Sequence, residues 1–158
     1  MRVGIGYDFH RFTEGSKLVL GGVEIPYVKG LEGHSDADVL MHAICDALLG
    51  ACGEEDIGFH FPSSDPNYKD VSSVELVKKV MEIVKQKGMK VYNIDTIVIC
   101  EEPKLMPFKE AIRQKIAEVL EIDKNFVSVK ATTTEGLGSV GRGESAAAQA
   151  VVLLEEKQ

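Results

Sequence analysis

Residues 3–10, VGIGYDFH, alternate strictly between large apolar side chains and glycine or polar ones. One face of this alternation carries Val3, Ile5, Tyr7 and Phe9. The other face carries Gly4, Gly6, Asp8 and His10. Strict alternation over this length predicts a half-buried β-strand. It also places Asp8 and His10 on one face with their Cα atoms roughly 6–7 Å apart, so both side chains can converge on a single ion.

The segments that follow mix strand and helix patterns. Residues 17–27, KLVLGGVEIPY, predict a hairpin that turns at Gly21-Gly22. Residues 34–51 have helical spacing, with Ser35 as the expected N-cap and Asp36 and Asp38 in the first turn. Residues 52–70 are rich in Asp, Ser, Pro and Gly, and they predict a long loop of the kind that often carries function.

The second half of the chain continues this mixture. Ser72 and Glu75 form a capping-box pattern before a helix that Gly88 ends. Strands are expected over 90–100 and 127–133, and a helix over 108–122 with Pro107 in its first turn. The tail over 144–156 is ambiguous, because its alanines favour helix while AVVLL suits a buried strand. The order of elements predicts one α/β (α+β) domain over residues 1–158.

Composition narrows the class of protein. The net charge of −7 argues against nucleic-acid binding, which needs a basic surface. No apolar run approaches the ~20 residues that cross a membrane, and the N-terminus has no targeting pattern. The three cysteines show no CxxC pair, so buried free thiols in a reducing compartment are expected. We therefore expect a cytoplasmic protein, or a mature one from a compartment of similar redox state, with neither a membrane nor a nucleic-acid partner.

A metal site is the first candidate for chemistry. His42 falls on the expected helix, and together with Asp8 and His10 it makes a catalytic zinc set, which has three protein ligands and an open fourth position. Asp38 and Asp46 lie one helical turn to either side of His42 and could accept its second ring proton. The alternative is an Asp-x-His pair that arises by chance, with histidines that only pack.

The glycine-rich loop over 132–144 is the second candidate. Its hydroxyls and backbone N–H groups can cradle phosphate oxygens, and Glu135 is a hard ligand suited to Mg²⁺ or Mn²⁺. Lys104 and Arg142 could donate to phosphates, although an ordinary polar turn with solvated cations remains the alternative. GIGYDF is not a dinucleotide-binding fingerprint, because it lacks the third glycine and the helix opening.

Taken in order, these motifs resemble the 2-C-methyl-D-erythritol 2,4-cyclodiphosphate synthase family over nearly the whole chain. The matching stretches are GYDFHRF, GLEGHSDADVLMHAICDALLGA, DIGFHFPSSDP, EEPKLMP, KATTTEGLG and GRGE. The resemblance implies a lyase that converts 4-diphosphocytidyl-2-C-methyl-D-erythritol 2-phosphate to the 2,4-cyclodiphosphate and CMP in non-mevalonate isoprenoid biosynthesis. It implies Zn²⁺ on Asp8, His10 and His42, and a second cation, Mg²⁺ or Mn²⁺, on Glu135.

The resemblance also assigns roles to other residues. His34 and Thr133 are expected to stabilise the transition state. The small-molecule substrate is expected to contact Ser35, Asp56, Ile57, Gly58, Phe61, Pro62, Ser63, Ser64, Asp65, Cys100, Glu101, Glu102, Pro103, Lys104, Leu105, Met106, Thr132, Thr134 and Arg142. The implied assembly is a ferredoxin-like, chorismate-mutase-like homotrimer with active sites between subunits. Each protomer has a four-stranded sheet packed against helices, which makes the ambiguous tail a strand.

Three positions depart from the family pattern. Ser63 and Gln149 stand where many or some relatives carry an acidic residue, and Ser139 stands where some carry Phe. The last two adjoin an axial cavity that holds an isoprenoid diphosphate in some relatives, so we do not predict that site here. Two rival readings stay open: a zinc hydrolase that uses metal-bound hydroxide, and a non-catalytic trimeric binding module.

Overall fold

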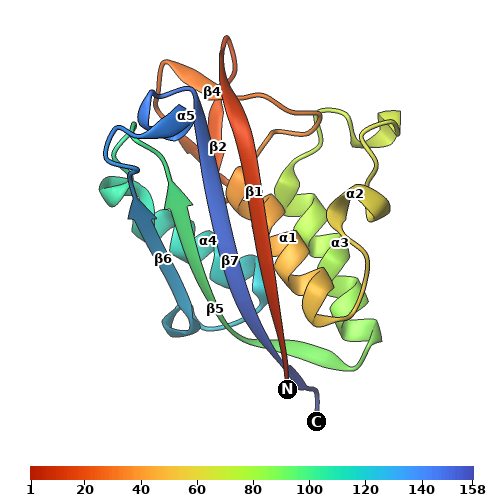
Figure 1. The fold of residues 1–158 in the computed structure, drawn as a ribbon. Coiled ribbons are helices and arrows are strands. Elements are labelled where there is room, and N and C mark those ends of the chain that lie inside the picture. The colour runs from red at the N-terminus through yellow and green to blue at the C-terminus, as the bar shows by residue number, and fades with distance from the viewer.

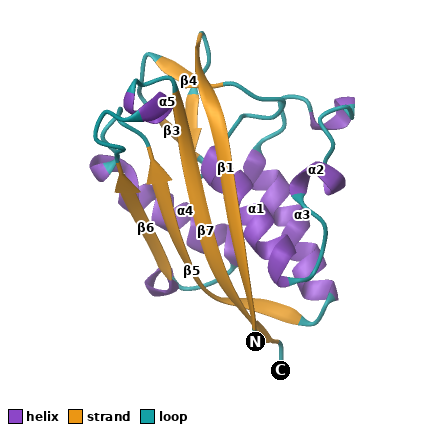
Figure 2. Ribbon diagram, viewed as in Figure 1, coloured by secondary structure: helices purple, strands orange, loops and turns teal.

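The computed structural model describes all 158 residues and consists of a five-stranded sheet with its main helices on one face (Figures 1 and 2). The strands, in sheet order, are β4 (Lys29–Leu31), β1 (Arg2–Glu14), β7 (Ser145–Glu156), β5 (Met89–Ile99) and β6 (Val127–Thr132). All neighbours are antiparallel except β5 and β6, which are parallel. The sheet therefore has one strand more than the four expected, because the short β4 pairs with the end of β1.

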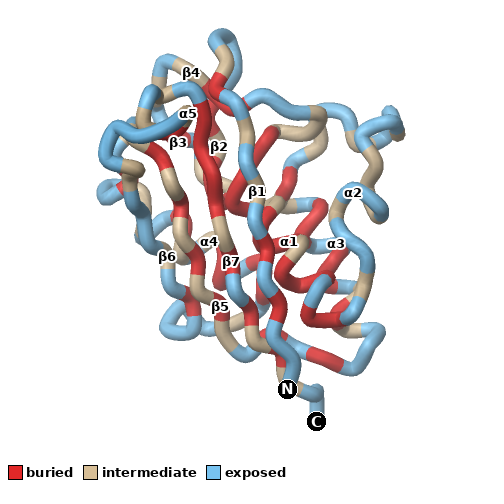
Figure 3. The backbone as a smooth tube through the Cα atoms, viewed as in Figure 1, coloured by how far each residue is buried: buried red, intermediate tan, exposed pale blue.

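The ambiguous tail forms β7, the central strand. It pairs with β1 from Arg2↔Leu154 to Arg11↔Ser145 on one side and with β5 on the other. Figure 3 shows most of β7 buried. The alanines are therefore strand residues, and their small side chains allow the helices to pack close to one face of the sheet. Ala146, Ala148 and Ala150 are buried on the helix-facing side, and Ala147 is buried on the opposite side of the sheet.

The half-buried opening strand is confirmed, and its buried face is the one with the glycines. The main chain of helix α1 (Val39–Ala51) lies so close to β1 that a Cβ on Gly4 or Gly6 would collide with the carbonyl oxygens of Ala47 or Ala43. The apolar side chains of the other face stay 47–68% exposed. They are Val3, Ile5, Tyr7 and Phe9. The absence of side chains on the glycines is what allows α1 to pack here.

Helix α1 begins later than predicted. Asp38, not Ser35, is the N-cap, and its carboxylate accepts a hydrogen bond from Met41 N. The same carboxylate accepts from Gly21 N at 2.9 Å and Gly22 N at 2.7 Å. Those glycines form the predicted turn between β2 (Leu18–Leu20) and β3 (Val23–Ile25). One buried carboxylate thus satisfies the helix end and the hairpin turn together.

Helix α3 (Ser73–Gln86) is capped from a distant segment. Ser72 occupies the N-cap position, but its side chain makes no capping hydrogen bond, so the predicted capping box does not form. Asp36 accepts from Ser73 N instead, at 3.1 Å. Lys87 and Gly88 end the helix, the latter with a left-handed φ of 71°. The contact ties the segment before α1 to the start of α3.

The remaining elements are short, apart from one helix. Helix α4 (Lys109–Leu120) packs beside β6 and follows a 3-10 turn, Met106–Phe108, that contains Pro107. The predicted loop over 52–70 contains α2 (Ile57–His60) and a 3-10 turn, Pro66–Tyr68. Another 3-10 turn, Lys124–Phe126, precedes β6, and α5 (Gly138–Gly141) lies in the glycine-rich loop. None of the helices combines the length and apolarity that a membrane crossing requires.

Candidate metal centre and substrate cavity

Three side chains from β1 and α1 converge at one point. Asp8 Oδ2 lies 2.8 Å from His10 Nε2 and 3.0 Å from His42 Nδ1, and the two ring nitrogens are 3.3 Å apart. Asp8 and His10 share the helix-facing side of β1, and His42 is in the first turn of α1. The close approach of α1 to the glycines of β1 therefore brings the three together. We call Asp8, His10 and His42 the metal triad.

The geometry of the metal triad fits a tetrahedral zinc ion. Zinc bonds of about 2.0–2.1 Å at tetrahedral angles place ligand atoms about 3.3–3.4 Å apart, and the observed separations are slightly shorter. His10 Nδ1 lies 2.9 Å from the carbonyl oxygen of Glu32, which can only accept, so Nδ1 carries a proton and Nε2, beside Asp8, is the ring atom that can bind a cation. The three side chains are 14–26% exposed, which leaves one face of the site open.

Electrostatics also favour a cation here. Burial alone raises the pKa of Asp8, but hydrogen bonds and charge from His10 and His42 outweigh it and lower that pKa to about 2. Burial opposes the charged form of His10, yet its hydrogen bond to Asp8 raises its pKa above 6.5. An ionised Asp8 carboxylate therefore faces both rings, and a divalent cation would replace the proton that His10 otherwise takes up beside it.

The two aspartates expected to hold His42 from behind have other partners. Both oxygens of Asp38 are engaged by backbone N–H groups of the hairpin turn and of α1. Asp46 Oδ1 accepts from Ile57 N at 2.8 Å and so fixes the start of α2. Positions one helical turn from His42 share its face of the helix, but its ring turns away from them toward β1 and α3. That expectation is wrong for both residues.

The partners of His42 Nε2 are hydroxyls that the sequence reading missed. Ser73 Oγ lies 2.8 Å from this nitrogen and Ser35 Oγ 3.0 Å from it. Ser73 is the first residue of α3 and lies 31 positions after His42 in the sequence. Its only sequence signal was the Ser72-Ser73 pair at a helix start, which suggests capping and gives no indication of a histidine partner.

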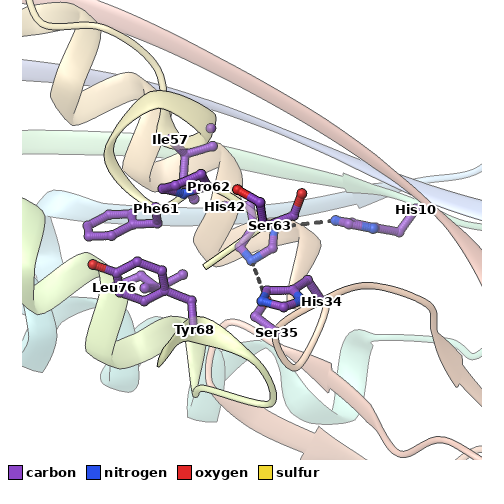
Figure 4. Close-up of a pocket in the computed structure, with 12 residues that line it drawn as sticks. His10, His34, Ser35, His42, Ile57, Phe61, Pro62, Ser63, Tyr68 and Leu76 are labelled. Atoms are coloured by element: carbon purple, nitrogen blue, oxygen red, sulfur yellow. Dashed lines mark hydrogen bonds between the residues drawn. The ribbon is translucent and has the colours of Figure 1, made fainter. Parts of the chain in front are cut away.

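A cavity of about 350 Å³ opens beside the metal triad, and we call it the triad cavity (Figure 4). His10, His34, Ser35 and His42 form its polar side. Predicted substrate contacts that line it are Ile57, Gly58, Phe61, Pro62, Ser63 and Ser64, and the prediction missed Tyr68 and Leu76. Figure 4 shows Phe61, Tyr68 and Leu76 grouped at the end away from His10. The cavity thus joins a polar, metal-binding end to an apolar one.

Two other predicted contacts support this cavity from its edge. Asp56 caps α2 by accepting from Phe59 N at 3.0 Å. Asp65 caps the 3-10 turn that follows, and its carbonyl oxygen lies 3.1 Å from His34 Nε2. Since a carbonyl only accepts, that nitrogen carries a proton and Nδ1 is the ring atom left for a ligand.

A second cavity, of about 180 Å³, lies where β5 and β6 end, and we call it the loop pocket. Its predicted lining residues are Cys100, Glu101, Pro103, Lys104, Leu105, Met106, Thr132 and Thr133. Glu102, Thr134, Glu135 and Arg142 were expected to contact ligands but do not line it in this single chain. Figure 1 shows β6 and α2 at opposite sides of the molecule, so one protomer does not bring the two cavities together.

Glu101 organises the rim of the loop pocket. Its Oε1 accepts from Thr134 N at 2.9 Å and from Gly136 N at 3.2 Å, and these bonds, the one from Gly136 first, lower its pKa. Glu135 has a left-handed φ of 54°, and its N–H donates to Thr133 Oγ at 3.1 Å. The Glu135 carboxylate makes no hydrogen bond or ion pair within the chain. Arg142 is held by both oxygens of Glu144, at 3.0 and 3.3 Å.

Comparison with known proteins gives a consistent result. Residues 1–155 match the model of the YgbB family. The 2-C-methyl-D-erythritol 2,4-cyclodiphosphate synthase of Syntrophomonas wolfei is 59% identical over 156 residues, covering 99% of each chain. The synthase of the same name from Bacillus subtilis is 56% identical over 155 residues, covering 98% of each chain.

Solved structures agree with these relatives. A CDP-bound 2C-methyl-D-erythritol-2,4-cyclodiphosphate synthase superposes with a TM-score of 0.90 at 35% identity, covering 98% of this chain and 100% of that one. The Plasmodium falciparum IspF in complex with CDP gives 0.87 at 34% identity, covering 99% and 97%. The bifunctional IspDF of Campylobacter jejuni gives 0.94 at 43% identity; 98% of this chain matches 42% of that longer protein.

Proposed function

The chain belongs to the YgbB family and has the cyclodiphosphate synthase function of non-mevalonate isoprenoid biosynthesis, and we propose that the metal triad and the loop pocket act together in that reaction. The substrate is 4-diphosphocytidyl-2-C-methyl-D-erythritol 2-phosphate. An oxygen of its 2-phosphate bonds to the β-phosphorus, the bond from that phosphorus to the oxygen bridging it to the α-phosphate breaks, and CMP leaves with the bridging oxygen. The products are 2-C-methyl-D-erythritol 2,4-cyclodiphosphate and CMP.

The metal triad is proposed to hold Zn²⁺. The observation that supports this most strongly is the convergence of one carboxylate oxygen and two histidine ring nitrogens within 3.3 Å of one another. Zinc bound there would polarise a phosphate oxygen as a Lewis acid. The chain supplies the orientation: Glu32 fixes the tautomer of His10, and the open face of the site points into the triad cavity.

The triad cavity is proposed to bind the methylerythritol phosphate part of the substrate. Nucleophile and electrophile belong to one molecule, so the chain needs no activated nucleophile of its own, and its task is to hold the substrate folded. His34 and Thr133 are proposed to stabilise the transition state by hydrogen bonds. His34 is kept in place for this by the carbonyl oxygen of Asp65. Ser63 lines the cavity and can donate to a substrate hydroxyl in place of a carboxylate.

The loop pocket is proposed to bind the cytidine diphosphate part. Its walls combine backbone groups after β5 with the hydroxyls of Thr132 and Thr133 and the ammonium of Lys104. Glu135 is proposed to hold the second cation, Mg²⁺ or Mn²⁺, since it presents a carboxylate free of internal partners beside those hydroxyls. The two CDP complexes among the structural neighbours support a nucleotide diphosphate as ligand.

The two cavities must meet across a subunit interface for this reaction, and we propose a homotrimer. The exposed apolar stripe on β1 supports this, because exposed apolar patches of that kind mark association surfaces. We also propose a cytoplasmic location, supported by three buried cysteines that form no disulfide. Sedimentation analysis tests the assembly: a monomer at working concentration would contradict a site shared between subunits.

The reaction itself is tested by following the phosphorus atoms. Incubation with the bifunctional substrate and Mg²⁺ should release CMP and give a single product whose two phosphates are joined in a ring, as read by ³¹P NMR. A zinc hydrolase would give an open bisphosphate with CMP, and a binding module would leave the substrate intact. Either result overturns the proposal.

A further inference from the structure

His42 Nε2, the ring atom that faces away from the metal triad, lies against a buried hydroxyl. Ser73 Oγ is 2.8 Å from it, and the Ser73 side chain has no exposed surface. A hydroxyl can donate or accept, so this contact alone does not decide which atom carries the proton. The group behind Ser73 decides it.

That group is the carboxylate of Asp36. One of its oxygens accepts from Ser73 N at 3.1 Å, and the other makes a short contact with Ser73 Oγ. An ionised carboxylate only accepts, so the Ser73 hydroxyl must donate to Asp36. Its lone pairs are then left for His42 Nε2, so this contact favours a ring proton on that nitrogen. His42 Nδ1, which lies 3.0 Å from Asp8 Oδ2, is then the ring atom left for a cation.

We infer that Ser73 and Asp36 are positioning residues of the metal centre: together they hold His42 in the one tautomer that can ligate through Nδ1. The inference rests on the zinc site proposed above. The two histidines of the triad use opposite ring nitrogens, and each has its own anchor. The carbonyl oxygen of Glu32 fixes His10, and a hydroxyl backed by a carboxylate fixes His42.

Ser35 is the competing partner of His42 Nε2, at 3.0 Å. Its hydroxyl has no carboxylate behind it, and it already accepts weakly from Ala37 N at 3.3 Å. Ser35 also lines the triad cavity, where a substrate phosphate could engage it. The geometry thus separates two roles: Ser73 orients the ring permanently, and Ser35 is free to turn toward the substrate.

Backbone contacts keep Asp36 at the correct distance. Asp36 N donates to Val71 O at 3.1 Å, and Asp70 N donates to His34 O at 2.9 Å. These bonds join the segment before α1 to the segment before α3 on both sides of the carboxylate. These bonds therefore connect the segment that carries His34 and Ser35 to Ser73, the residue that holds the ring of His42.

The test compares Ser73→Ala with Ser72→Ala, its matched neighbour, whose side chain makes no capping hydrogen bond. Zinc affinity is measured by competition with a chromophoric chelator, and the ring tautomer of His42 by long-range ¹H–¹⁵N NMR on metal-free protein. Ser73→Ala should bind zinc roughly 10- to 100-fold more weakly, the usual effect of removing such a partner. Its His42 should carry the ring proton more on Nδ1, the atom that faces Asp8, than the wild type does, while Ser72→Ala matches the wild type.

Asp36→Asn is the second variant, because it keeps a capping oxygen for α3 and removes the demand that Ser73 donate. It should shift the His42 tautomer and weaken zinc binding even if Ser73→Ala folds poorly. Wild-type zinc affinity in both variants, with Nε2 still protonated, would overturn the inference. A wild-type protein that binds zinc but makes no cyclic product would overturn the proposed function alone. A wild-type protein that binds no zinc would overturn both.

Discussion

The metal triad and the loop pocket differ in how completely one chain builds them. Each triad ligand is buried on several sides, and the anchors of both histidines come from segments that the fold holds firmly. The loop pocket is smaller, at about 180 Å³ against about 350 Å³ for the cavity beside the triad, and its proposed cation ligand, Glu135, has a carboxylate without any partner in the chain. One half of the site is therefore preorganised before any ligand arrives. The other half requires substrate, cation or a neighbouring subunit to complete it.

The largest effect is expected from removing one ligand of the preorganised half. His42→Ala should abolish most bound zinc and nearly all CMP release, because two ligands hold zinc far less tightly than three. Elemental analysis and a CMP assay on the same preparation measure both. His60→Ala is the matched control for zinc content, since His60 lies outside the metal triad. Full activity in zinc-free His42→Ala protein would refute the Lewis-acid account.

A methyl group at Gly6 should damage the packing that creates the metal triad. Its Cβ would meet the backbone of α1 at Ala43, so Gly6→Ala should lower the free energy of unfolding by about 3 kcal/mol or more. Zinc affinity should fall as well, because α1 carries His42. Gly50→Ala is the control: it lies in α1 with its nearest neighbour 3.9 Å away, and it should stabilise by up to ~1 kcal/mol.

Thermal unfolding gives both values, at roughly 2–4 °C per kcal/mol for a chain of this size. Equal melting temperatures for Gly6→Ala and the wild type would show that the approach of α1 to β1 is not as close as described.

Glu135→Gln should separate the two halves. We expect zinc content and zinc affinity to stay unchanged, because Glu135 is not one of the three residues of the metal triad. The concentration of Mg²⁺ or Mn²⁺ needed for half-maximal CMP release should rise severalfold, since an amide is a weaker ligand than a carboxylate. Metal titrations of variant and wild type that superimpose would remove Glu135 from the proposed cation site.

The smallest effect concerns the rim of the loop pocket. Hydrogen bonds from Gly136 N and Thr134 N lower the pKa of Glu101 below its ordinary value of 4.5. Their stabilising contribution is therefore complete above that value and is lost as the pH falls through the lowered pKa. Amide exchange at Thr134 and Gly136 should accelerate on acidification. In Glu101→Gln it should be faster at neutral pH and independent of this titration; a wild-type-like profile would contradict the role.

The sequence predicted the parts of the site that depend on local periodicity. Alternation put Asp8 and His10 on one face of β1, and helical spacing put His42 on α1, so the triad needed only those two elements to pack together. Gly4 and Gly6, which permit this packing, were predicted only to lie on the face opposite the apolar side chains. Alternation predicted a half-buried strand without indicating which face is buried, and in the single chain the apolar face is exposed.

The parts that local patterns missed depend on contacts between distant segments. Asp36 was expected in the first turn of its own helix, and it instead caps α3 at Ser73. Asp38 was expected behind His42, and it instead ties the hairpin turn to α1. Whether residues 144–156 form a helix or a strand was ambiguous from their alanines, and the strand followed only from the family resemblance. The central position of β7 in the sheet was not predicted. Propensity and spacing contain no information on which far segment supplies a partner.

The central claim is that Asp8, His10 and His42 coordinate one divalent cation and leave one of its coordination positions open. X-ray absorption at the zinc edge, with an anomalous difference map, on protein purified without chelators tests it most directly. The account predicts one zinc ion with two nitrogen ligands and one protein oxygen ligand at about 2.0–2.2 Å and a fourth ligand from solvent or substrate. Absence of any transition metal, or a fourth ligand from the protein, would contradict it.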